Sequence, residues 1–148
     1  MADETTVKFM YPPNFVGTYN EGDKGIRRVI VKCTNISDGT GEDDAIKIKR
    51  TDMKNSDGDI PKKLIIEKID YDVSGMTVYV EYNNANSDRV AVLTDSAGCM
   101  DFNSIGGYAP TYETADGEND VGDIVLTTDG ESLGDSYDIT LTVKLSGK

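Results

Sequence analysis

Apolar and polar residues alternate with a period of two along much of this chain. The alternation is clearest at residues 137–145, which carry apolar side chains on one side and Asp, Thr and Lys on the other. This pattern is typical of an antiparallel strand with one buried and one solvated face. The side chains that we expect to face the core here are Tyr137, Ile139, Leu141, Val143 and Leu145.

The same alternation recurs at residues 65–73 and 76–82, on either side of Ser74-Gly75. Serine followed by glycine favours a tight turn, so we expect 64–73 and 76–82 to form a β-hairpin. The side chains expected on one face are Ile65, Ile69, Tyr71 and Val73 before the turn, and Met76, Val78, Val80 and Tyr82 after it.

Shorter segments of the same kind occupy much of the remaining chain and are separated by clusters of Gly, Asp, Asn and Ser. In one of them, Ile46 and Ile48 alternate with Lys47 and Lys49. No stretch keeps a helical period of about 3.6 residues over a dozen positions. About nine short strands in 148 residues predict a single all-β domain, an antiparallel β-sandwich or a jelly-roll or Greek-key barrel. The further segments are residues 5–10, 26–34, 45–50, 88–94, 99–102 and 123–128.

The first twenty residues differ from the rest because Pro12-Pro13 favours an extended path and cannot lie in a central strand. We therefore expect residues 1–20 to form an N-terminal arm with an edge strand, and residues 21–148 to form the β-sandwich domain. Tyr11, Pro12 and Pro13 are candidates for contact with a neighbouring subunit. The alternative is a plain flexible start to the chain.

The net charge of −12 arises entirely from the second half of the chain. Residues 1–68 carry 12 basic and 12 acidic side chains, whereas residues 69–148 carry 3 basic and 15 acidic ones. This balance argues against nucleic acid and against anionic membranes, because both need clustered Lys and Arg. No apolar run approaches the length of a membrane span.

The chain contains no histidine, which excludes Ser-His-Asp and Cys-His catalysis and histidine-ligated zinc. Gly134-Asp135-Ser136 is similar to the nucleophile block of some esterases, but without a histidine we expect a turn there. Cys33 and Cys99 are too few for a thiolate metal site, and we expect them to be separate, reduced and buried. We therefore expect no enzyme activity and no cofactor.

Two kinds of candidate site remain in the loops. Tyr108 and Tyr112 belong to a long loop and are candidates for an interaction site, since Tyr is favoured at interfaces; the alternative is ordinary loop packing. Calcium is the least implausible metal ion for these loops, because hard cations need several oxygen donors from one turn. The weak calcium candidates are Asp116, Glu118, Asp120 and Asp123, although Asp-rich segments are also ordinary turn formers.

Residues 62–145 resemble a family of small structural proteins of tailed bacteriophages. The family pattern is a hairpin LEKIxYDIGGM, then DF followed by FGG, then GDI, TT and GDSY leading into a last amphipathic strand. Here Tyr82 replaces a common tryptophan, and Ser74 and Ile105 replace a glycine and a phenylalanine. Order and spacing both match; residues 1–60 match less clearly. The matching residues are 66–76, Asp101-Phe102, Ile105-Gly106-Gly107, Gly122-Asp123-Ile124, Thr127-Thr128 and Gly134-Asp135-Ser136-Tyr137.

The resemblance implies a non-enzymatic component of the virion. A small, acidic, all-β protein made in the host cytoplasm fits a capsid decoration (cement) protein on the capsid surface. Its expected partners are the phage major capsid protein and further copies of itself, as a homodimer or homotrimer. The alternative is a tail or fibre part, or a module that binds carbohydrate on the host surface.

Overall fold

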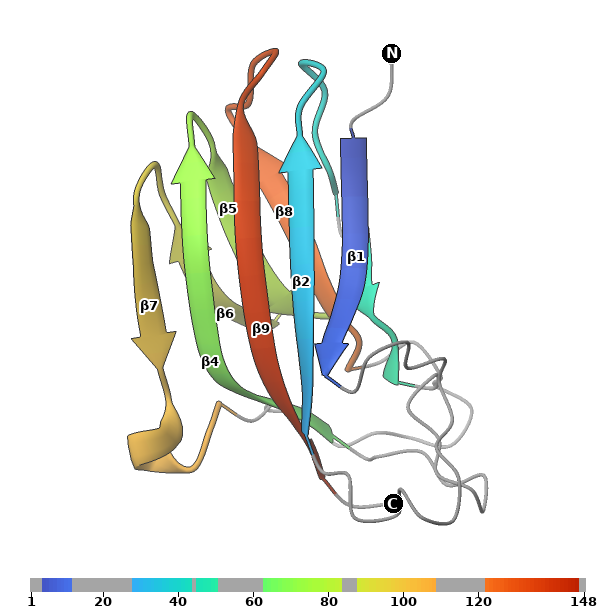
Figure 1. Ribbon diagram of the computed structural model, residues 1–148, viewed down its shortest axis with the longest axis vertical. Coiled ribbons are helices and arrows are strands. Elements are labelled where there is room, and N and C mark those ends of the chain that lie inside the picture. Colours follow the sequence, from blue (N-terminus) through green and yellow to red (C-terminus); the bar gives the residue numbers. More distant parts are fainter. Residues whose placement is uncertain are drawn as a thin grey trace.

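The structure is a computed structural model, which describes residues 4–11, 28–43, 45–50, 63–83, 88–108 and 122–146. Within these ranges the chain forms nine β-strands in two antiparallel sheets that pack face to face (Figure 1). The same ranges contain one short 3-10 helix, η3 (Asn103–Ile105).

The larger sheet has five strands in the order β1-β2-β9-β4-β7 and forms the front layer in Figure 1. The smaller sheet has four strands in the order β3-β8-β5-β6. The strands of the larger sheet are β1 (Glu4–Tyr11), β2 (Arg28–Ile36), β9 (Ser136–Ser146), β4 (Lys63–Ser74) and β7 (Ala97–Asp101). The strands of the smaller sheet are β3 (Ala45–Ile48), β8 (Ile124–Asp129), β5 (Thr77–Tyr82) and β6 (Asp88–Leu93).

The eight strands from β2 to β9 follow the order of a jelly roll, with β2-β9-β4-β7 in one sheet and β3-β8-β5-β6 in the other. Apart from the β5–β6 pair, each connection after β2 carries the chain from one sheet to the other. β1 extends this arrangement by one strand at the edge of the larger sheet. The predicted all-β sandwich or jelly roll is therefore confirmed.

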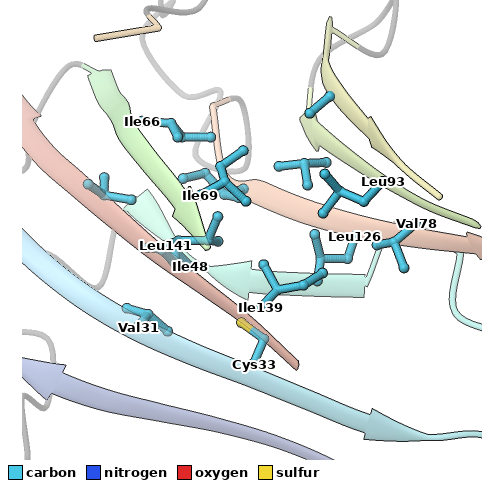
Figure 2. Close-up of a cluster of buried hydrophobic side chains, with 14 of the residues drawn as sticks. Val31, Cys33, Ile48, Ile66, Ile69, Val78, Leu93, Leu126, Ile139 and Leu141 are labelled. Carbon is cyan, nitrogen blue, oxygen red and sulfur yellow. The ribbon is translucent and has the colours of Figure 1, made fainter. Parts of the chain in front are cut away.

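The core lies between the two sheets and consists mostly of the side chains that alternation assigns to the inner faces (Figure 2). In β9, Ile139, Leu141 and Val143 have no exposed surface, as predicted from the pattern at 137–145. In β5, Val78 and Val80 are equally enclosed. Burial of each such side chain contributes about 1.5–3 kcal/mol to the free energy of unfolding, so the core between the two sheets is the main source of stability.

The predicted hairpin between 64–73 and 76–82 is wrong in its pairing, although both strands are present. β4 pairs with β9 and β7, whereas β5 pairs with β8 and β6 in the other sheet. The turn at Ser74-Gly75 carries the chain from the larger sheet to the smaller one at one end of the sandwich. Alternation does not distinguish the two cases, because both strands direct their apolar side chains into the same core.

A bulge in β4 reverses the expected alternation in its first half. The register with β9 shifts between Ile66 and Lys68, so Leu64 and Ile66 are fully buried and Ile65 is half-buried. The expectation that Ile65 shares a face with Ile69 is therefore wrong, because the extra residue of a bulge changes which side chains point inward.

A similar register shift in β3 changes the positions of its isoleucines. Alternation places Ile46 and Ile48 on one face, but the register with β8 shifts between them. Ile46 is 49% exposed, whereas Lys47 and Ile48 are buried. The charge of Lys47 is consequently enclosed in the protein.

The two cysteines are separate and reduced, as expected, but they differ in burial. Cys33 lies in the core, and Cys99 is exposed on β7. The expectation that Cys99 is buried is wrong, because its register with β4 places it beside Asp70, which points outward.

Candidate functional site

The outer face of the five-stranded sheet is polar and carries an open groove of about 550 Å³ at one end. The groove crosses β1, β2, β9 and β4, and most of its lining residues are outward-facing residues of these strands. It is lined by Thr6, Thr34, Asn35, Ile36, Asp72, Ser74, Ser136, Tyr137 and Asp138.

Two carboxylates and several hydroxyls line this groove, together with the apolar side chain of Ile36. Asp72 of β4 lies directly opposite Asp138 of β9, and Lys32 Nζ is 3.2 Å from Asp138 Oδ2. Like charges on directly opposed residues destabilise a sheet, and the half-exposed Lys32 offsets part of that cost. The groove can therefore accept a polar ligand that donates hydrogen bonds.

Tyr137 is the one aromatic residue among the groove's lining residues, and it does not offer a ring for stacking. Its side chain is 2% exposed because it belongs to the core. Its hydroxyl forms a hydrogen bond with the Glu42 carboxylate. A ligand in the groove would thus be held by hydrogen bonds and charge, without an aromatic platform.

A buried ion pair lies beneath the same end of the sandwich. Lys47 Nζ is 2.6 Å from Glu42 Oε2, and the two side chains are 2% and 11% exposed. Thr128 fixes the position of Glu42 from β8, because its hydroxyl accepts the Glu42 N–H at 2.9 Å. Together with Tyr137 these groups connect the segment after β2 to β3, β8 and β9, which is a structural role.

The two thiols differ in chemical environment. Burial raises the pKa of the Cys33 thiol to about 12, so this group remains neutral and unreactive. Desolvation and a hydrogen bond with the Asp70 carboxylate raise the pKa of Cys99, although its side chain faces solvent.

Tyr108, a predicted interaction residue, is packed against the sandwich and is half-buried. Its backbone pairs with Ile66 in both directions, at 2.7 and 3.1 Å. Its ring stacks on Tyr82 at 6.4 Å between centroids and meets the edge of Phe102 at 5.8 Å. These contacts match the alternative of loop packing.

Of the other predicted interaction residues, the structure describes one. Tyr11 is the last residue of β1, opposite Ile30 in β2. Pro12, Pro13 and Tyr112 lie outside the described residues.

Of the weak calcium candidates, Asp123 is described and has no exposed surface. Its carboxylate accepts the Arg50 N–H at 2.7 Å, so it holds a chain segment in place. Asp116, Glu118 and Asp120 lie outside the described residues. Over the part of the chain that the structure describes, no group of three or more Cys, Asp and Glu is arranged to hold a metal ion.

Two of the residue blocks that carry the resemblance in the sequence meet in space at one end of the sandwich. Gly75 has a φ of +83°, and a Cβ added there would lie 2.2 Å from Asp135 Oδ1. Asp135 accepts the Ser37 N–H through its carbonyl and the Ser132 N–H through its carboxylate, each at 2.7 Å. The Gly134-Asp135-Ser136 block is therefore a turn, as expected, against which the β4–β5 turn packs.

Two further blocks meet at the bulge of β4. Phe102 N–H donates to the Glu67 carbonyl at 2.8 Å, and Gly107 N–H donates to the Phe102 carbonyl at 2.9 Å. Gly107 has a φ of +95°, and a Cβ there would lie 2.5 Å from Ile65 Cγ2. The motif residues thus fix turns and close contacts of the framework.

Glu67 is a buried acidic residue that the sequence analysis missed. Its side chain is 7% exposed and binds Arg28 through both oxygens, at 2.6 and 3.2 Å. The hydrogen bond with Glu67 raises the pKa of Arg28. Alternation gave no reliable signal for it, because the bulge between Ile66 and Lys68 changes which side chains of β4 point inward.

Comparisons with known proteins add little. No protein-family model matches the chain, and no curated protein matches it. A solved structure, a mutant of a carbohydrate binding module family 29, is similar at a TM-score of 0.38 and 12% identity, over 97% of this chain and 94% of that chain. A likeness of that degree carries no inference about this chain's ligands. In the described ranges, no helix is long and apolar enough to span a membrane.

Proposed function

We propose that this chain is a non-enzymatic structural protein of a tailed-phage virion, which binds the outside of the head shell as a decoration protein. The observation that carries the proposal is the match of residues 62–145 to the phage pattern in both order and spacing. The high acidity and the all-β architecture support the same role.

The positions of the motif residues explain why the resemblance extends over so much of the chain. Gly75, Asp135, Phe102 and Gly107 occupy turns in which another residue would strain the backbone or lose a contact. A shared pattern of this kind supports a shared sandwich framework. The exposed sheet faces and edges are then available for partner-specific contacts.

The buried ionisable groups have a structural role. Glu42 with Lys47, and Glu67 with Arg28, form pairs in which the carboxylates are enclosed. A catalytic acid or base must reach a substrate, and these groups are engaged in holding strands together.

The test is addition of the purified chain to phage heads that lack it. We expect saturable binding at a fixed ratio to the major capsid protein, and release of packaged DNA at a higher temperature in decorated heads. Bovine serum albumin, another acidic protein, is the matched control for nonspecific charge effects. Binding to purified tails with none to heads would overturn the proposal.

A second candidate function is carbohydrate binding, which the groove on the five-stranded sheet favours. Its carboxylates and hydroxyls could bind sugar hydroxyls, although Tyr137 does not provide a stacking surface. A glycan array with the wild type and with Asp72→Ala/Asp138→Ala would test this function. Asp129→Ala, an exposed change outside the groove, is the control. Binding that the double variant abolishes and the control retains would favour carbohydrate recognition.

A further inference from the structure

β1 forms an open edge of the five-stranded sheet. It pairs with β2 on one side, and on its other side no strand of the described residues pairs with it (Figure 1). The backbone N–H and C=O groups along such an edge are available to another strand.

The regular part of β1 is long and free of proline, and its charges, Glu4 and Lys8, alternate with the core-side positions. It spans eight residues, whereas the other edge strands β7, β3 and β6 span five, four and six. Its register with β2 is regular from Glu4 to Phe9, and the bulge follows. The positions on the core side are Thr5, Val7 and Phe9, which carry no charge, and no proline interrupts the strand.

The apolar layer of the sandwich is incomplete at this edge. Val7 is 41% exposed, although its cross-strand partner Cys33 is fully buried. Met10, at the bulge, is 50% exposed. A strand added beside β1 would cover part of this apolar surface.

The outer side of β1 carries a charge that lacks a counterpart. Lys8 is exposed and lies directly opposite Lys32 of β2, so two cations face each other at the edge. Lys32 reaches Asp138, but Lys8 forms no ion pair with any residue of the described ranges. An acidic residue placed beside Lys8 would neutralise this charge, and a chain of net charge −12 has many acidic residues to offer.

We propose that β1 pairs with β1 of a second copy of this chain, antiparallel and about a two-fold axis through Thr6. This register keeps the outer faces of both copies on the same side, because residues of equal parity lie opposite each other. In this register, Thr6 of one copy lies opposite Thr6 of the other. Thr5 of each copy lies opposite Val7 of the other, and Glu4 of each copy lies opposite Lys8 of the other. The product is a continuous ten-stranded sheet.

Several registers keep the outer faces of the two copies on the same side, and the charges of β1 favour this one among them. A two-fold axis through Lys8 would place the two lysines opposite each other, which is unfavourable. The axis through Thr6 instead gives two acid–base pairs. Because the contact is confined to one strand edge and its side chains, it belongs to the small interfaces of weak, concentration-dependent dimers. This inference does not depend on the proposed function.

Sedimentation equilibrium of the full chain over a concentration series tests the pairing. We expect the wild type to form dimers and Lys8→Glu to raise the dissociation constant at least about tenfold, because two acid–base pairs become like-charge pairs. Glu4→Lys should do the same. An equimolar mixture of the two variants should recover dimers, since each strand of a mixed dimer faces its complement.

Lys144→Glu, on the same outer face but in the central strand β9, is the control and should dimerise as the wild type does. Amide hydrogen exchange should show protection that increases with concentration in β1 and not in β7. A monomer at all concentrations would overturn the proposal, as would an oligomer unaffected by either edge variant. Protection of β1 that arises only on phage heads would overturn it too, and would assign the edge to a shell protein.

Discussion

At the scale of single residues, the exposed Cys99 thiol beside Asp70 offers a direct chemical test of the structure. The pKa of Cys99 is raised, so less thiolate is present at a given pH than in a free cysteine, and the fraction increases as the pH rises. Cys33 is buried and its pKa is about 12. We therefore expect one reactive thiol in the native protein and two after unfolding.

Removal of the Asp70 charge should lower the pKa of Cys99 and shift its pH–reactivity profile to lower pH. We predict that Asp70→Asn speeds the reaction of Cys99 with a disulfide reagent by at least about twofold near pH 8. Asp129→Asn, in the other sheet, should leave the rate unchanged. An unchanged rate in Asp70→Asn would show that the two side chains are not neighbours.

Gly75 combines a positive φ with surroundings that leave no room for a side chain. We predict that Gly75→Ala lowers the free energy of unfolding by about 3 kcal/mol, because strain at positive φ adds to the contact with Asp135. Gly130→Ala is the control, since Gly130 has a φ of +73° with nothing within 4 Å of an added Cβ. It should cost about 1 kcal/mol. Equal losses in urea unfolding would contradict the contact between the two turns.

At the scale of elements, the buried pair of Lys47 and Glu42 connects β3 to the segment after β2. We predict that Lys47→Ala lowers the free energy of unfolding by roughly 3 kcal/mol, because an uncompensated carboxylate would remain enclosed. Lys32→Ala removes the half-exposed partner of Asp138 and should cost about 0.5 kcal/mol or less. Similar values for both variants would show that Lys47 is not buried as described.

Alternation predicted the strands well because one face of each strand is buried and the other is solvated. It did not predict how they pair, since β4 and β5 direct side chains into one core from opposite sheets. Alternation also did not predict the bulges in β4 and β3, and for that reason it did not predict that Glu67 and Lys47 are buried. A groove assembled from β1, β2, β9 and β4 depends on strand order, which period-two patterns do not encode.

At the scale of the whole molecule, the net charge of −12 acts against the compact state through self-repulsion. We predict that raising NaCl from about 0.01 to 0.2 M increases the unfolding temperature, because the screening length shortens over this range. Thermal unfolding followed by circular dichroism measures the effect. A decrease with salt would show that attractive ion pairs outweigh the repulsion.

The same charge bears on how many copies can lie side by side. A dense coat of acidic subunits is stable only if each subunit docks on a less acidic surface or pairs its few basic groups with acidic neighbours. The proposed contact with a head shell would meet the first condition, and the proposed pairing of β1 with a second copy would meet the second.

The most direct test of the proposed function is the copy number of this chain in purified virions, measured by quantitative mass spectrometry against the major capsid protein. A decoration protein should be present at a fixed ratio near one per capsid subunit, or one oligomer per local symmetry axis. A ratio tens of times lower would contradict the head-shell role and favour a tail component. Absence from the particle would refute a virion function altogether.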